Sequence, residues 1–280
     1  MFLGKVAFIG AGSIAESLIA GLIDSGYIES DQIAITNKED LDRLDVLHTK
    51  YGVLATSNRQ LAITGASVVF LAMKPKDVAV AIEQCRDLVN EKQLIISLVA
   101  GVTIDTIKEL FENENINVIR AMPTTSSLVR KSATALAYHD NIPFEKSQTA
   151  KRLFERVGIV AKVEEDELHA MTGLFGSGPA YIYYVIEQFE RAAMALGIHR
   201  DIAKPFIQQT LIGSISMLQE TNKSPLTLRK KVTSPNGTTQ AGISILEDRE
   251  VANSFLNCFI EATVRSREIQ EEYEKIIKLK

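Results

Sequence analysis

The sequence contains little cysteine, no tryptophan and few histidines. The two cysteines, Cys85 and Cys258, lie far apart and lack a CxxC spacing, so neither a disulfide framework nor a structural zinc site is expected. The four histidines are dispersed, and no metal site is predicted. This usage of cysteine fits a protein of the reducing cytoplasm.

The sequence also lacks a dense basic block and an uninterrupted apolar run of membrane length. Its net charge of −4 offers no attraction for nucleic acid, and the short cluster Arg229–Lys231 has the pattern of a solvated helix end. The apolar stretch Val6–Ile23 is interrupted by Glu16 and by glycines, so a strand, a turn and a helix explain it better than a signal peptide or membrane anchor. We expect neither nucleic acid nor a membrane as a partner.

What the sequence does contain is a change of pattern along the chain. Up to about residue 163, apolar β-branched runs alternate with amphipathic stretches, which is typical of parallel strands joined by crossover helices. Beyond that point, apolar residues recur at a spacing of three and four, which predicts helices. We predict a Rossmann-like, doubly wound α/β domain over residues 1–163 and an all-α domain over 164–280. The predicted strands are Lys5–Ile9, Ile33–Thr36, Val68–Met73, Leu94–Val99 and Val118–Met122, with Thr134–His139 and Gly158–Val163 as added edge strands; the long predicted helices are Pro179–Leu196, Ile202–Glu220 and Ala252–Ile277.

The first predicted strand leads into the dinucleotide fingerprint Gly-x-Gly-x-x-Ala. Gly10 permits the tight turn, Gly12 lets a pyrophosphate approach the backbone, and Ala15 lets the next helix pack closely on the strand. The N-terminus of that helix offers unpaired N–H groups to the phosphates. The predicted cofactor-binding residues of this loop are Gly10, Ala11, Gly12, Ser13, Ile14 and Ala15.

The end of the second strand favours NADP, although NAD stays possible. NAD enzymes usually carry an acid there for the ribose hydroxyl, whereas this chain has the neutral Asn37 and the cation Lys38. An exposed turn is the alternative interpretation, because Glu39 and Asp40 follow and dilute the positive charge. A further wall of the cofactor site is predicted at the end of a later strand, at Ala72, Lys74 and Pro75.

Two segments of the helical part contain residues that are typical of turns. In Thr172–Tyr181, three glycines precede Pro179 and allow a close approach of chain segments, with Ser177 as a candidate helix cap. Val232–Glu247 combines a proline turn, an Asn-Gly pair and a helix start, whose free N–H groups suit a small carboxylate. An ordinary helix capped by Thr238 or Thr239 is the alternative.

Over essentially its whole length the chain resembles the pyrroline-5-carboxylate reductase family. The motifs Ala7–Gly12, Lys74-Pro75, Gly176–Tyr181 and Ser234–Gly242 occur in the family's order and spacing, and the last is its most specific signature. The resemblance implies NADPH-dependent reduction of 1-pyrroline-5-carboxylate to L-proline, the last step of proline biosynthesis. It also implies a homodimer formed through the helical domain.

The resemblance further implies where the substrate binds. It assigns the carboxylate site to the loop residues Ser234, Asn236, Gly237, Thr238 and Thr239. It places Thr239 Oγ1 against the imine nitrogen, as the catalytic residue. Since a threonine hydroxyl is a poor acid, we expect it to orient the imine and relay a proton rather than to act as a true general acid.

Three departures from the family's pattern leave other functions open. The family's Met-Pro-Asn-Thr-Pro is replaced around Thr124–Ser127, beside the expected nicotinamide. His169 replaces an acid and is interpreted as a packed or surface residue, and Phe175 replaces a small residue. The alternatives are a divergent NADP-binding paralogue with a regulatory or accessory role, or a reductase of another cyclic imine.

Overall fold

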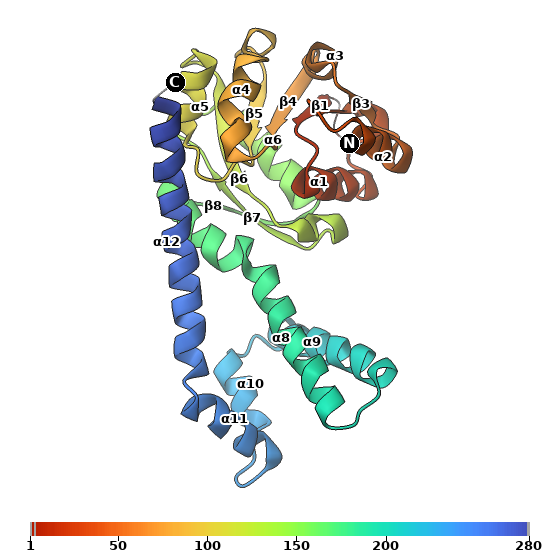
Figure 1. The fold of residues 1–280 in the computed structure, drawn as a ribbon, viewed down its shortest axis with the longest axis vertical. Coiled ribbons are helices and arrows are strands. Elements are labelled where there is room, and N and C mark those ends of the chain that lie inside the picture. The colour runs from red at the N-terminus through yellow and green to blue at the C-terminus, as the bar shows by residue number, and fades with distance from the viewer. Residues whose placement is uncertain (1, 3, 279–280) are drawn as a thin grey trace. The chain divides into compact units, whose positions relative to one another are not determined.

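The N-terminal part of the chain is built on one eight-stranded sheet in the order β3-β2-β1-β4-β5-β6-β7-β8, seen in the computed structural model (Figure 1). The structure describes residue 2 and residues 4–278. All neighbouring strands are parallel except β6 and β7, which are antiparallel. The strands are β1 Lys5–Ile9, β2 Ile33–Thr36, β3 Leu54–Thr56, β4 Ala66–Leu71, β5 Leu94–Ser97, β6 Asn117–Met122, β7 Ser132–Ala137 and β8 Gly158–Lys162.

Helices cover both faces of the sheet, which is why the central strands are apolar at successive positions. One buried cluster joins β1, β2 and β4 to helices α1, α2 and α6, and the other joins the opposite face of the strands to α3, α4 and α5. These helices are α1 Ser13–Asp24, α2 Leu41–Tyr51, α3 Arg59–Ile63, α4 Val78–Glu83, α5 Ile104–Phe111 and α6 Phe144–Glu155.

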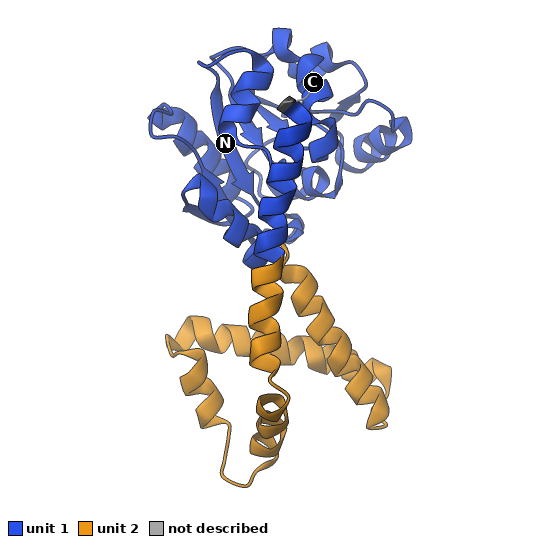
Figure 2. Cartoon of the chain, turned by 60° about the vertical axis from the view of Figure 1, so that its left-hand side comes forward, with its two compact units in different colours: residues 1–176, 262–280 blue, residues 177–261 orange. Residues whose placement is uncertain are grey.

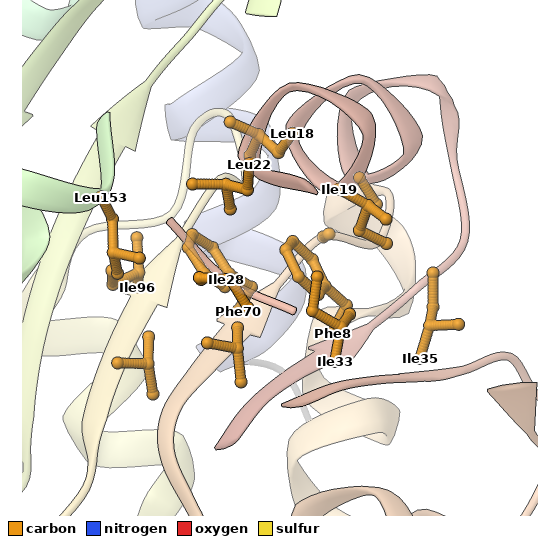
Figure 3. Packing of buried hydrophobic residues seen from close by; sticks show 14 of the residues in the cluster. Phe8, Leu18, Ile19, Leu22, Ile28, Ile33, Ile35, Phe70, Ile96 and Leu153 are labelled. Carbon is orange, nitrogen blue, oxygen red and sulfur yellow. The ribbon is translucent and has the colours of Figure 1, made fainter. Parts of the chain in front are cut away.

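Stacked aromatic rings hold the centre of the first cluster. The rings of Phe8 and Phe70 lie on neighbouring strands, parallel and 4.5 Å apart, and Phe154 of α6 meets Phe70 edge-on at 6.1 Å. Leu18 and Leu22 of α1 pack over them (Figure 3). Fully burying aliphatic and aromatic side chains contributes about 1.5–3 kcal/mol each, so α1 is fixed firmly on the sheet.

The C-terminal part is helical and forms a second compact unit (Figure 2). Unit 1 comprises residues 1–176 and 262–280, and unit 2 comprises Ser177–Glu261. The compact units divide at Gly176, and the last part of α12 belongs to unit 1. The domain boundary at residue 163 stays a prediction. The remaining helices are α7 Leu168–Met171, α8 Gly178–Ala195, α9 Arg200–Thr221, α10 Pro225–Lys231, α11 Thr238–Asp248 and α12 Val251–Lys278.

The glycine-rich segment before α8 is helical rather than a turn. Thr172–Gly176 is π-helical. A Cβ atom at Gly173 would lie 2.5 Å from Thr263 Oγ1 of α12, so the glycine permits the close approach that the sequence predicts. Ser177 is the N-cap residue of α8, but its side chain makes no capping hydrogen bond.

Strand predictions from the sequence are accurate in the centre of the sheet and less so at its margins. The bounds of β1 and β2 are confirmed, and the other predicted strands are present with ends displaced by a few residues. The prediction of Thr134–His139 as an edge strand is wrong, because β7 pairs with β6 on one side and β8 on the other. Strand β3 was not predicted, since three residues carry no periodicity. In the described part of the chain, none of the helices has the length and apolar character needed to span a membrane.

Candidate functional site

Gly10 makes the turn between β1 and α1 in a backbone conformation that other residues rarely adopt. Its φ is 108°, and a Cβ atom there would lie 2.5 Å from the carbonyl oxygen of Ala72. The Gly10 N–H donates to the Thr36 carbonyl at 2.9 Å, and the Ala72 N–H donates to the Ile9 carbonyl at 2.8 Å. The ends of β1, β2 and β4 are thus tied together, and the predicted tight turn is confirmed.

Helix α1 begins beside open space. Gly12 is its N-cap residue, in extended conformation and without a capping side chain. A Cβ atom at Gly12 would meet no atom within 4 Å, so packing within the described chain does not require this glycine. Ala15 is fully buried, as close packing of the helix on the sheet demands; Ala11 is buried too, Ile14 is half-buried and Ser13 is exposed. The free N–H groups of the helix start are therefore accessible to an anion.

A pocket of about 250 Å³ lies beyond the carboxyl ends of β1 and β2. It brings together Gly10, Asn37 and Lys38, as the sequence predicts, and adds Thr36 and Arg59. The Thr36 hydroxyl is buried, and no hydrogen-bond partner for it exists among the residues that the structure describes. An unsatisfied buried hydroxyl costs about 1–3 kcal/mol, so a ligand with polar groups would relieve a defect of this pocket.

The predicted wall at the end of β4 only partly reaches this pocket. Ala72 is buried against Gly10, and Lys74 is exposed at the start of the 3-10 turn that begins at Pro75. None of these three residues lines the pocket, whereas their neighbours Met73 and Asp77 do. The assignment of Ala72, Lys74 and Pro75 to the cofactor site stays a prediction.

A group of charges lies directly behind the glycine loop. Glu16, in the first turn of α1, accepts hydrogen bonds from Lys50 at 2.9 Å and Tyr51 at 2.8 Å, and it pairs with Arg43. The Lys50 ammonium first, and then the Arg43 guanidinium, lower the pKa of Glu16 to about 2. Arg43 Nε also donates to the Ala11 carbonyl at 3.0 Å. Lys50 and Arg43 thus offset the negative charge of the Glu16 carboxylate, which would otherwise repel phosphates from this helix start.

The altered segment after β6 is well packed. Thr124 N–H donates to Ser132 Oγ at 3.0 Å, and the Ser127 hydroxyl donates to the Thr124 carbonyl at 2.8 Å. Ser127 is fully buried, and a Cβ atom at Gly21 of α1 would lie 2.2 Å from its carbonyl oxygen. Serine and threonine hydroxyls therefore bond the segment to itself and to the start of β7, while its backbone packs closely on α1 at Gly21.

The predicted substrate loop forms the N-terminus of α11. Asn236 has a φ of 59°, the left-handed geometry that the sequence predicts for it, and its N–H donates to Gln240 Oε1 at 2.6 Å. Gly237, not Thr238 or Thr239, is the N-cap residue, and no side chain caps the helix. Thr239 and Ser234 are exposed. The interpretation as a helix capped by a threonine is wrong, and the first-turn N–H groups stay accessible.

His169 is a packed residue, as predicted. It is only 5% exposed, and its Nδ1 lies 3.0 Å from Ser266 Oγ on α12. Burial lowers its pKa, so the ring is neutral at neutral pH. In the described residues no group of three or more His, Cys, Asp or Glu side chains is arranged to hold a metal ion.

Comparison with known proteins identifies the family. Residues 165–269 match the family model for pyrroline-5-carboxylate reductase dimerisation, and residues 5–101 match that for NADP oxidoreductase, coenzyme F420-dependent. Pyrroline-5-carboxylate reductase 2 of Bacillus subtilis is 40% identical over 269 residues, covering 96% of each chain. This chain belongs to the pyrroline-5-carboxylate reductase family. The reductases of the family are NAD(P)H-dependent oxidoreductases acting on a C=N bond.

Solved structures of pyrroline-5-carboxylate reductases have the same fold. That from Coxiella burnetii is 35% identical, covers 96% of this chain and 99% of its own, and superposes with a TM-score of 0.85. The Plasmodium falciparum enzyme, solved with NADP bound, is 21% identical with a TM-score of 0.88 and covers 96% of this chain and 99% of its own. The resemblance predicted from the sequence motifs is therefore confirmed.

Proposed function

We propose that this chain reduces 1-pyrroline-5-carboxylate to L-proline with NADPH, in the cytoplasm. The observation that carries the proposal is the uncapped start of α11, where Asn236 and Gly237 present the first-turn N–H groups to a carboxylate. Charge-assisted hydrogen bonds of this kind contribute about 1.5–3 kcal/mol each. Ser234, Thr238 and Thr239 complete the binding loop.

The residues of the first unit fit the cofactor. Gly10 and Gly12 form a cradle that a side chain would fill, and Thr36, whose buried hydroxyl has no partner among the described residues, lines the adjoining pocket with Asn37 and Lys38. Ala11, Ser13, Ile14 and Ala15 shape the helix start, and Ala72, Lys74 and Pro75 form the neighbouring strand end. When bound, NADPH supplies a hydride to the C=N carbon of the substrate.

Thr239 is the residue we assign to catalysis. Its hydroxyl orients the imine nitrogen and passes a proton to the developing amine from water. Most of the rate enhancement comes from holding the imine at reacting distance from the hydride donor, for which the loop backbone provides the fixed points. A hydroxyl in this role contributes one to two orders of magnitude, about the lower end for proton-transfer groups.

We further propose that the protein is a homodimer formed through its helical unit. Among the described residues of unit 2, the one buried apolar cluster consists of Ala193, Ala203 and Ile207. By contrast, many large apolar side chains of α8 and α9 are exposed, such as Met194 at 66% and Phe206 at 71%. Exposed apolar surface of this extent needs a partner, and a second copy fits the dimerisation model that the sequence matches.

The test is NADPH oxidation by the purified chain when 1-pyrroline-5-carboxylate is supplied, with proline measured as the product. We expect turnover that is faster with NADPH than with NADH. Tight NADPH binding without turnover of this or another cyclic imine would favour the accessory role. The altered segment Thr124–Ser127 is the departure from the family's pattern that makes this role an alternative. Turnover of a different cyclic imine alone would change the substrate but keep the chemistry.

A further inference from the structure

The pocket at the end of β2 contains a cation that lies outside the expected cofactor motif. Besides Lys38, Arg59 lines it, from the first residue of α3. Asn58 holds the start of this short helix, because its Oδ1 accepts the Leu61 N–H at 3.1 Å. Arg59 thus reaches the pocket from a fixed backbone position on an element that follows β3.

The two cations of the pocket differ in how far their charge is already neutralised. Lys38 forms an ion pair with Glu39 at 3.3 Å, and both side chains are exposed. Arg59 bonds through Nη1 to the neutral amide oxygen of Gln84, and within the described residues it forms no ion pair with a carboxylate. The uncompensated positive charge of the pocket is therefore that of Arg59, with Asp77 and Glu39 as the acids of the lining.

We propose that Arg59 binds the 2′-phosphate of NADP and contributes more to the preference for NADP over NAD than Lys38 does. The carboxyl end of the second strand is where dinucleotide folds contact the adenosine ribose, and a nearby arginine suits a phosphate there. The planar guanidinium forms paired hydrogen bonds to phosphate oxygens, and the bond to Gln84 fixes its orientation. This inference rests on the proposed function, because it assumes that NADP occupies the pocket.

The test measures binding of adenosine 2′,5′-bisphosphate and of AMP by calorimetry, so that no turnover is needed. Both probes carry the adenosine, but only the first carries the 2′-phosphate. We expect Arg59→Gln to weaken binding of the bisphosphate about tenfold to a hundredfold and to leave AMP binding unchanged, since a charge-assisted pair is lost. Lys38→Gln has a smaller effect, and Arg59→Lys an intermediate one.

Arg86→Gln is the matched control, because Arg86 pairs with Glu112 on the surface and does not line the pocket. It should bind both probes as the wild type does. Thermal melts show whether Arg59→Gln is folded, and Arg59→Lys keeps the charge if it is not. Unchanged bisphosphate binding by Arg59→Gln overturns the inference alone. A wild-type protein that binds neither NADPH nor the bisphosphate contradicts the proposed function as well.

Discussion

At the scale of single residues, the two glycines of the dinucleotide fingerprint, Gly10 and Gly12, differ in whether the fold requires them. Gly10 has a positive φ and no room for a side chain, so it is needed for the fold. Gly12 has ordinary backbone geometry and faces open space, so packing within the described chain does not require it. An added methyl group at Gly12 is therefore compatible with the fold and tests cofactor binding separately.

We predict that Gly12→Ala folds normally but binds NADPH at least about tenfold more weakly, because the new Cβ atom occupies the approach of the pyrophosphate. Calorimetric titration with NADPH and a thermal melt measure the two effects. Ser25→Ala, at the other end of α1, is the control and should bind as the wild type does. Wild-type affinity in Gly12→Ala would show that the pyrophosphate lies elsewhere.

A second prediction for a single residue concerns Thr239, the residue assigned to catalysis. We predict that Thr239→Ala lowers turnover of 1-pyrroline-5-carboxylate about tenfold to a hundredfold while NADPH affinity stays unchanged, because only the hydroxyl at the imine is lost. Thr239→Ser keeps a hydroxyl and should restore most of the rate. Equal rates for the wild type and Thr239→Ala would remove Thr239 from the mechanism.

Residues that are selected by their backbone conformation could be predicted from the sequence. Side chains that reach a site only because the fold brings distant segments together could not. Gly10 and the left-handed Asn236 were found because turns restrict which residues they accept. Arg59 was missed as a candidate site residue, and Thr36 was noted only as part of the strand end, without its buried hydroxyl, which lacks a partner in the described part of the chain. Their significance appears only when β2 and α3 meet at one pocket. The one sequence signal was Asn58, a good cap before a helix too short to show periodicity.

At the scale of elements, Glu16 ties α1 to α2 through Arg43 and Lys50. Its pKa is lowered to about 2 in the folded state, from 4.5. The stabilisation is therefore fully present above about pH 4.5 and is lost as the pH falls toward about pH 2. Because the ion pairs are partly exposed, we expect about 1–2 kcal/mol at neutral pH.

We predict that Glu16→Gln lowers the free energy of unfolding by that amount at neutral pH, and that the difference from the wild type shrinks at about pH 3. Urea denaturation at the two pH values measures it. Glu155→Gln, which removes the exposed pair with Lys151, is the control and should change stability by only a few tenths of a kcal/mol. A difference that is independent of pH would contradict the role of the carboxylate.

Element boundaries show why the sequence predicts helix positions better than helix caps. The periodicity of α8, α9 and α12 was found within a few residues. The start of α11 was attributed to a threonine cap, yet the backbone of Gly237 occupies the cap position. Propensity favours Thr at a cap, but the left-handed turn at Asn236 decides where the helix begins.

At the scale of the whole molecule, the exposed apolar surface of unit 2 is the main feature. Tyr184, Leu246 and Phe255 line an apolar groove of about 870 Å³ formed by α8, α11 and α12 within that unit. We predict that the protein sediments as a dimer or larger assembly, and that Tyr184→Glu weakens the association at least about tenfold.

Phe144→Glu provides the matched control for that experiment. Phe144 is 75% exposed on α6 of the sheet unit, so the same kind of change is made on the surface of the other unit. Its sedimentation should equal that of the wild type. A wild-type protein that sediments as a sharp monomer would contradict the proposed dimer.

The central claim is hydride transfer to the imine carbon of 1-pyrroline-5-carboxylate. The most direct measurement supplies NADPH in which deuterium replaces both hydrogens at C4 of the nicotinamide, together with the substrate, and analyses the product by mass spectrometry. The account predicts proline that carries one deuterium, bonded to C5, the former imine carbon. Proline without deuterium, or NADPH binding with no proline formed, would contradict it.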